Sequence, residues 1–204
     1  MTKTLRGRKH EVVLHPGDVV LTVSGSFLSR AIRRFTRGLR EPRTRFSHCE
    51  LVVISGTLES ADVVSADGHG ITLRKIYPKH TGHQVAVYRL HWTKNPELNL
   101  KIGWNIASRI RTKLGAPYPI WRLFMHLLDW FLLDAFVFRR AGRSSKTMEC
   151  SSLVAWAVEP YVKFRDRPWY LISPDDIDDS IQGWLKAGKA RLLYDSSKNQ
   201  PVAG

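Results

Sequence analysis

The hydrophobic pattern of the chain changes at Asn95-Pro96, and this change limits the possible folds more than any other feature. Before this point, short runs rich in Val, Ile, Leu and Thr are separated by turn-forming residues, a pattern typical of β-strands. We expect strands in both halves of segment 11–23, which is split by a turn at 16–18, and over residues 47–54, 57–64, 70–76 and 84–90. Ser55-Gly56 is predicted to be a tight hairpin turn, which makes the strands an antiparallel meander.

After Asn95 the apolar residues recur at the spacing of a helix, at Ile102, Ile106, Ile110 and Leu114. Asn95 is a favourable N-cap, and Pro96 suits the first helical position. Gly115 is predicted to end the helix. Strands followed by helices predict an α+β fold, with an antiparallel sheet or small barrel packed against helices.

Residues 119–138 are apolar enough to resemble a membrane span. Four ionisable side chains would be costly at the centre of a bilayer, namely Arg122, His126, Asp129 and Asp134. We therefore expect a buried or half-buried helix, inserted near 119–146 into a single domain that covers residues 1–204. Docking of this helix on a membrane surface or on another subunit is the alternative.

The chain is strongly basic, with 32 Lys and Arg against 18 Asp and Glu and a formal charge of +14. Such a charge favours polyanions, including nucleic acid, anionic lipid and acidic wall polymers. The densest cluster, Arg30–Arg45, overlaps a short helix that we expect over 27–39 with Ser26 as its cap. No nucleic-acid-binding motif accompanies the charge, so we expect peripheral contact with an anionic membrane or polymer and no specific nucleic-acid recognition.

The N-terminal segment has no apolar run of signal-peptide length, and two cysteines cannot form a disulfide framework. These features predict a cytoplasmic protein with free thiols.

Cys150 is the residue with the clearest chemical potential. It is expected in the first turn of a helix that Thr147 caps and Pro160 interrupts, followed by a mixed tail. Backbone amides and the helix dipole at that position favour a thiolate. His48, on a predicted strand, could stabilise the thiolate and later protonate a leaving group. In a chain with eight His and two Cys, a structural thiol and an ordinary histidine are the simpler interpretation of this pair alone.

The order of several short motifs resembles permuted papain-like enzymes of the NlpC type, such as YiiX-like proteins and, more distantly, lecithin retinol acyltransferase. The motifs are Pro16-Gly17-Asp18 before a strand, Ser47-His48 entering the next, Leu58-Glu59-Ser60-Ala61 after it, Leu114-Gly115-Ala116-Pro117-Tyr118, and Cys150-Ser151-Ser152-Leu153-Val154 at a helix start. The resemblance spans roughly residues 14–76 and 100–158. It implies a cysteine hydrolase, either a peptidase or amidase or an acyl transferase, with no cofactor and no metal.

The resemblance also implies roles for individual residues. Cys150 would be the nucleophile, His48 the general acid and base, and Glu59 the third residue that orients the imidazole. Glu50 shares the face of His48 by strand alternation and is the reserve candidate for that third role. Tyr118 would line the substrate site. The substrate would be an amide or ester of a peptide, a cell-wall peptide or a lipid.

Two alternatives remain beside this interpretation. Strand alternation turns Cys49 away from the face of His48, so we expect Cys49 in the core, and no pattern of paired ligands supports a metal site. The charge and the aromatic-rich 119–138 segment also fit a non-catalytic basic module that binds an anionic membrane or nucleic acid.

Overall fold

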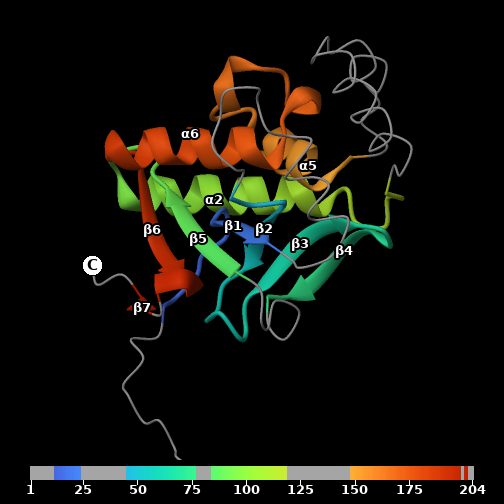
Figure 1. Cartoon of the computed structure of the whole chain (residues 1–204), viewed down its shortest axis with the longest axis horizontal. Coiled ribbons are helices and arrows are strands. Elements are labelled where there is room, and N and C mark those ends of the chain that lie inside the picture. The colour runs from blue at the N-terminus through green and yellow to red at the C-terminus, as the bar shows by residue number, and fades with distance from the viewer. Residues whose placement is uncertain (1–11, 24–44, 77–83, 119–147, 199, 202–204) are drawn as a thin grey trace, which may run out of the picture.

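The computed structural model describes residues 12–23, 45–76, 84–118, 148–198 and 200–201, and it has the predicted α+β class. An antiparallel sheet with the strand order β4-β3-β2-β1-β5-β6-β7 lies beneath a layer of helices (Figure 1). The strands are β1 (Val19–Val23), β2 (His48–Ile54), β3 (Asp62–Asp67), β4 (Gly70–Lys75), β5 (Gln84–Leu90), β6 (Ala190–Asp195) and β7 (Gln200–Pro201). The described α-helices are α2 (Pro96–Arg111), α5 (Cys150–Val158) and α6 (Pro174–Lys186), with 3₁₀ turns η1 (Phe164–Asp166), η2 (Trp169–Leu171) and η3 (Ser196–Lys198).

Both faces of the sheet are apolar, and strand alternation divides them. Leu21, Leu51 and Val64 belong to the cluster that packs under the helices. Val20 and Val52 belong to a second cluster on the opposite face. Burial on both faces explains why these strands are almost continuously hydrophobic in sequence.

A hairpin was expected between residues 47–54 and 57–64, and the prediction of its two-residue turn is wrong. Gly56 does not close a two-residue turn, because its backbone pairs with Leu14, with N···O distances of 2.8 and 3.2 Å. Thr57 then begins a helical turn, in which the amide of Ala61 donates to the Thr57 carbonyl at 2.8 Å. Strand β3 starts only at Asp62. The first half of segment 11–23 contributes this bridge at Leu14 and no strand.

The predicted helix after Asn95 is confirmed, and so is its cap. Asn95 Oδ1 accepts hydrogen bonds from the amides of Glu97 at 2.9 Å and Leu98 at 3.3 Å. At Gly103 the helix meets the loop before β1 so closely that an added Cβ would lie 2.1 Å from the Pro16 carbonyl oxygen. This contact fixes α2 against the start of β1.

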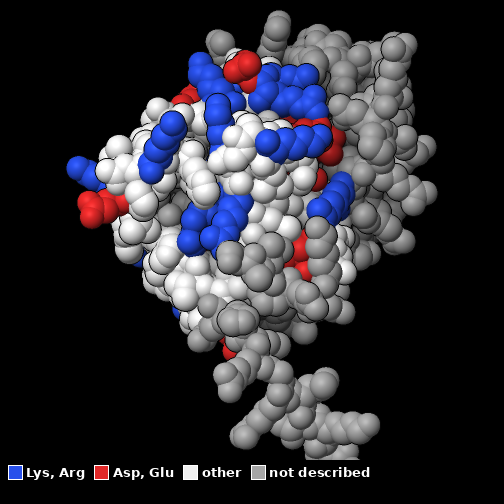
Figure 2. All heavy atoms as spheres, turned by 90° about the vertical axis from the view of Figure 1, so that its left-hand side faces the viewer, with Lys and Arg blue, Asp and Glu red and all other residues white. Residues whose placement is uncertain are grey.

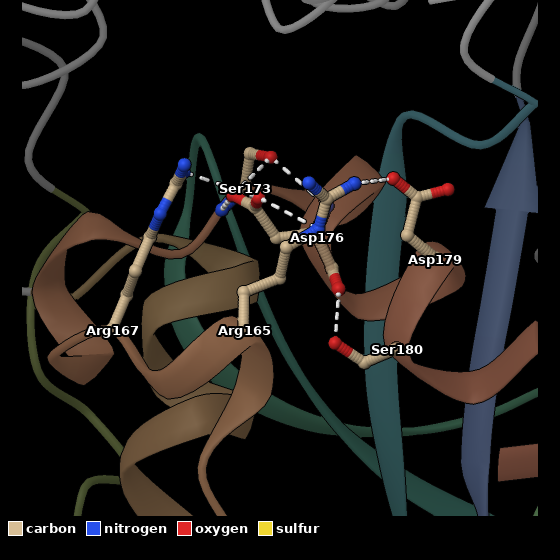
Figure 3. Close-up of polar contacts among 6 residues, drawn as sticks. All are labelled: Arg165, Arg167, Ser173, Asp176, Asp179 and Ser180. Atoms are coloured by element: carbon tan, nitrogen blue, oxygen red, sulfur yellow. Dashed lines mark hydrogen bonds and ion pairs between the residues drawn. The ribbon is translucent and has the colours of Figure 1, made fainter. Parts of the chain in front are cut away.

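The tail after α5 is mixed, as expected, and it contains the helix α6 and the strand β6. Ser173 and Asp176 form a capping box at the start of α6, with the Asp176 amide donating to Ser173 Oγ at 3.2 Å and the Ser173 amide donating to Asp176 Oδ2 at 2.9 Å. Arg167 reaches Asp176 at 3.3 Å, and Arg165 is ion-paired with Asp179 (Figure 3). These ion pairs tie the segment that follows α5 to the first turns of α6.

The helices predicted over 27–39 and 119–138 lie outside the described residues, as does the insertion near 119–146. Among the helices that the structure describes, none is both long and apolar enough to cross a membrane.

Candidate active site

Cys150 is the first residue of α5, whereas a helix capped by Thr147 would make it the third. Glu149 is the N-cap, and the Leu153 amide donates to the Glu149 carbonyl at 2.8 Å to close the first turn. Thr147 lies outside the described residues. The thiol therefore sits among amides at the positive end of a helix dipole, which favours a thiolate. Cys150 is buried, with 6% of its surface exposed.

His48 is the first residue of β2, and its ring lies beside the Cys150 side chain. Its ring is hydrogen-bonded to the Cys150 side chain. Its Nε2 atom lies 3.2 Å from Glu50 Oε1 and 2.9 Å from Ser65 Oγ. Because Nε2 faces these two oxygens, we infer that Nδ1 is the nitrogen that faces the sulfur. The His48 side chain keeps 21% of its surface exposed, so the pair is not sealed from solvent.

The carboxylate beside His48 is Glu50, the reserve candidate, and not Glu59. Glu50 is fully buried, and Arg74 Nε lies 3.9 Å from its Oε1. Glu59 is exposed in the turn before β3. This turn follows Ile54, six residues beyond His48 and so roughly 20 Å along the strand. The longer connection between β2 and β3 carries Glu59 farther from the imidazole, which corrects the expected placement.

The electrostatics of the pair favour charge on both partners. Burial alone would lower the pKa of His48, but the Cys150 sulfur and the Glu50 carboxylate raise that pKa to about 9. A hydrogen bond from the Cys49 side chain outweighs burial and, with the His48 charge, holds the pKa of Cys150 well below its usual value. Both shifts favour the charged pair, a thiolate beside an imidazolium.

Cys49 contributes to the site in a way that the sequence did not suggest. It is in the core as predicted, with 1% of its surface exposed. Its face of the sheet is the face on which α5 packs, so both its thiol and its backbone amide hydrogen-bond to Cys150. Burial and the Cys150 charge raise the pKa of Cys49 well above its usual value, so it remains a thiol that can donate.

Tyr118 lies near the same sulfur. The segment before it is held against β4, because the Gly115 amide donates to Ile71 O and the Ile71 amide donates to Ala116 O, both at 2.9 Å. Gly70 permits this approach with φ at +105°, since a Cβ there would lie 2.8 Å from Ala116 O. Burial and the nearby Cys150 charge raise the pKa of Tyr118, so its hydroxyl stays protonated and able to donate.

Within the described ranges, no group of three or more His, Cys, Asp and Glu side chains is arranged to hold a metal ion. No protein-family model matches the chain, and a search of curated proteins finds no match either.

Proposed function

We propose that the protein is a cysteine hydrolase that cleaves an amide or ester through a thioester on Cys150. The observation that carries this proposal is the contact between Cys150, at the first position of α5, and His48, whose Nε2 atom meets the buried Glu50 carboxylate. A structural cysteine needs none of these features. A nucleophile requires a partly accessible thiolate, a base within reach and a group that orients the base.

The reaction follows from the charges on the pair. The Cys150 thiolate attacks the carbonyl carbon, and the bond to the leaving nitrogen or oxygen breaks as His48 donates its proton to that atom. The acyl group then remains on sulfur as a thioester. Neutral His48 next takes a proton from water as the water oxygen attacks the thioester carbonyl. The C–S bond then breaks, which releases the acid and leaves Cys150 as a thiolate beside the His48 imidazolium.

Glu50 and Ser65 hold the imidazole during these steps. Both contact Nε2, and Glu50 bears a buried negative charge that stabilises the imidazolium. Cys49 would donate to the sulfur and keep its negative charge stable before attack. Tyr118, with a protonated hydroxyl near the sulfur, is suited to hydrogen-bond a substrate.

The arrangement of elements supports a permuted papain-like fold of the NlpC type, in which the histidine strand precedes the cysteine helix. Here β2 precedes α5 in the chain, and α5 packs on β2. By this resemblance the acyl group would come from a peptide, a cell-wall peptide or a lipid, and transfer to an acceptor other than water would use the same thioester. The net charge of +14 favours substrates carried on an acidic polymer or an anionic lipid surface.

Capture of the acyl-enzyme tests the proposal. The purified protein would be incubated separately with p-nitrophenyl acetate, muropeptides and phospholipids, and adducts would be located by intact mass and peptide mapping. We expect an acyl adduct on Cys150 with p-nitrophenyl acetate and with one natural class, and its loss in Cys150→Ser.

His48→Ala should slow adduct formation strongly, whereas His69→Ala, which alters an exposed residue, should not. Two outcomes would instead support a non-catalytic basic module. The first is an adduct spread over surface lysines. The second is a Cys150 that reacts at the rate of an ordinary thiol in both His48→Ala and His69→Ala.

A further inference from the structure

A second concave site lies away from Cys150, on the side of the molecule that carries the start of β1 and the C-terminal end of α6. Its volume is about 930 Å³, within the range of small-molecule pockets. The pocket reaches Tyr161, just beyond the end of α5, whereas Cys150 begins that helix. The nine residues of α5, roughly 13 Å of helix, therefore separate the two sites.

The walls of this pocket come from distant segments that are tied together by backbone and side-chain hydrogen bonds. The amide of His91 donates to Lys189 O at 2.8 Å, and the amide of Lys189 donates to Trp184 O at 2.8 Å. Thr93 and Asn99 exchange two hydrogen bonds of 2.8 Å across the loop that enters α2. These bonds fix the walls of the cavity relative to one another, and such preorganisation lowers the entropic cost of binding.

Aromatic rings give the pocket an apolar lining. Trp92 and Tyr161 lie with their ring centroids 6.0 Å apart and their planes tilted by 53°, and Trp184 contributes a third, half-buried ring. Tyr161 keeps 39% of its surface exposed although it is large and apolar. A planar group can stack on one of these tilted rings and contact its neighbour edge to face.

The charge of the lining is positive. Asp18 is its single acidic residue, and Arg89 neutralises it through bonds from Nε at 2.9 Å and Nη2 at 2.8 Å. Arg89 Nη2 also donates to Val13 O, which leaves Nη1 without a hydrogen bond to any residue in the described ranges. Exposed Lys94 and Lys189 add two positive charges that form no ion pair with a residue in the described part of the chain. Figure 2 shows this side of the molecule, where Lys and Arg cover more of the surface than Asp and Glu.

We propose that this pocket binds a small organic anion with a flat, apolar body. The planar part would stack among Trp92, Tyr161 and Trp184, while its carboxylate, sulfonate or phosphate would meet Lys94 and Lys189. The proposal does not depend on the reaction at Cys150, because the two sites share none of the residues named for either.

Calorimetric titration with two matched probes tests whether the pocket binds a flat organic anion. 1-Naphthalenesulfonate carries the ring and the charge, and 1-naphthalenemethanol carries the ring alone. We expect saturable binding of the sulfonate, about tenfold tighter than binding of the alcohol. Tyr161→Ala should weaken both probes.

Charge reversal separates the pocket from the general basicity of the chain. Lys94→Glu combined with Lys189→Glu should weaken the sulfonate about tenfold, since both lysines are exposed and can change without disturbing the core. The matched control is Lys101→Glu with Lys163→Glu, which changes net charge equally at exposed residues outside the lining. Equal binding of the two probes, equal loss in the two double variants, or no saturable binding of the sulfonate would each overturn the proposal.

Discussion

Replacement of Glu50 by Gln should uncouple the imidazole from the charge that holds it protonated. Glu50 Oε1 lies 3.2 Å from His48 Nε2, and the carboxylate is fully buried. Gln has nearly the same shape and can still accept a hydrogen bond through its amide oxygen. The substitution therefore removes mainly the negative charge.

The size of the effect follows from the separation of the two groups. An opposite charge at this range commonly shifts a pKa by about 1–3 units, and partial retention of the hydrogen bond places the expected change at about 1–2 units. Each unit corresponds to about 1.4 kcal/mol of preference for the charged form. The pKa of His48, raised to about 9 in the native site, should therefore fall. The imidazolium would then be lost at a lower pH than in the native protein.

Nuclear magnetic resonance titration of protein labelled with ¹⁵N in histidine measures this pKa directly. The signals of His48 are identified by their loss in His48→Ala. The matched control is Glu59→Gln, which makes the same chemical change at the exposed glutamate of the β2–β3 turn. An unchanged His48 pKa in Glu50→Gln, or an equal fall in Glu59→Gln, would refute the assignment of Glu50 as the orienting carboxylate.

Other changes test the remaining contacts. Cys49→Ala should raise the pKa of Cys150, because the Cys49 hydrogen bond is the main cause of its depression. Alkylation of Cys150 by iodoacetamide near neutral pH should then slow, while Cys49→Ser, which keeps a donor, should slow it less; equal rates in all three proteins would contradict this. Gly103→Ala should lower the free energy of unfolding by about 1–3 kcal/mol in urea denaturation, because its Cβ would meet Pro16 O at 2.1 Å. Gly183→Ala, in α6 with open space around its Cβ, should instead raise that free energy by about 0.5–1 kcal/mol, and a loss of stability there would count against the packing described.

Local signals in the sequence were sufficient where an element depends on its own residues. Strand β5 has the predicted bounds of 84–90, and α2 begins at Pro96 after its Asn95 cap. The start signal of α6 is also local, because Ser173 caps the helix, Pro174 takes its first position and Asp176 completes the capping box.

The β2–β3 connection is different, because its shape depends on a distant residue. Gly56 pairs with Leu14, far earlier in the chain, and this pairing displaces the two-residue turn that Ser55-Gly56 suggests. The choice between Glu50 and Glu59 depended on this turn. Alternation had already placed Glu50 on the face of His48, but only the length of the connection shows that Glu59 is carried away.

Cys49 shows a related limit. Alternation correctly predicted a core position for Cys49. It could not predict that the start of α5 would pack on the face that carries Cys49 and bring Cys150 against it. Contacts between a strand and a helix about a hundred residues later depend on packing, which local periodicity does not encode.

The ultraviolet absorbance of the thiolate, taken as the difference between the native protein and Cys150→Ala across a pH titration, tests the proposed ion pair most directly. The account predicts that Cys150 absorbs as a thiolate at about pH 7, below the usual cysteine pKa of about 8.5, and that His48→Ala moves the onset of this absorbance to a higher pH. A thiolate signal that appears only near pH 8.5–9, at the same pH with and without His48, would contradict it.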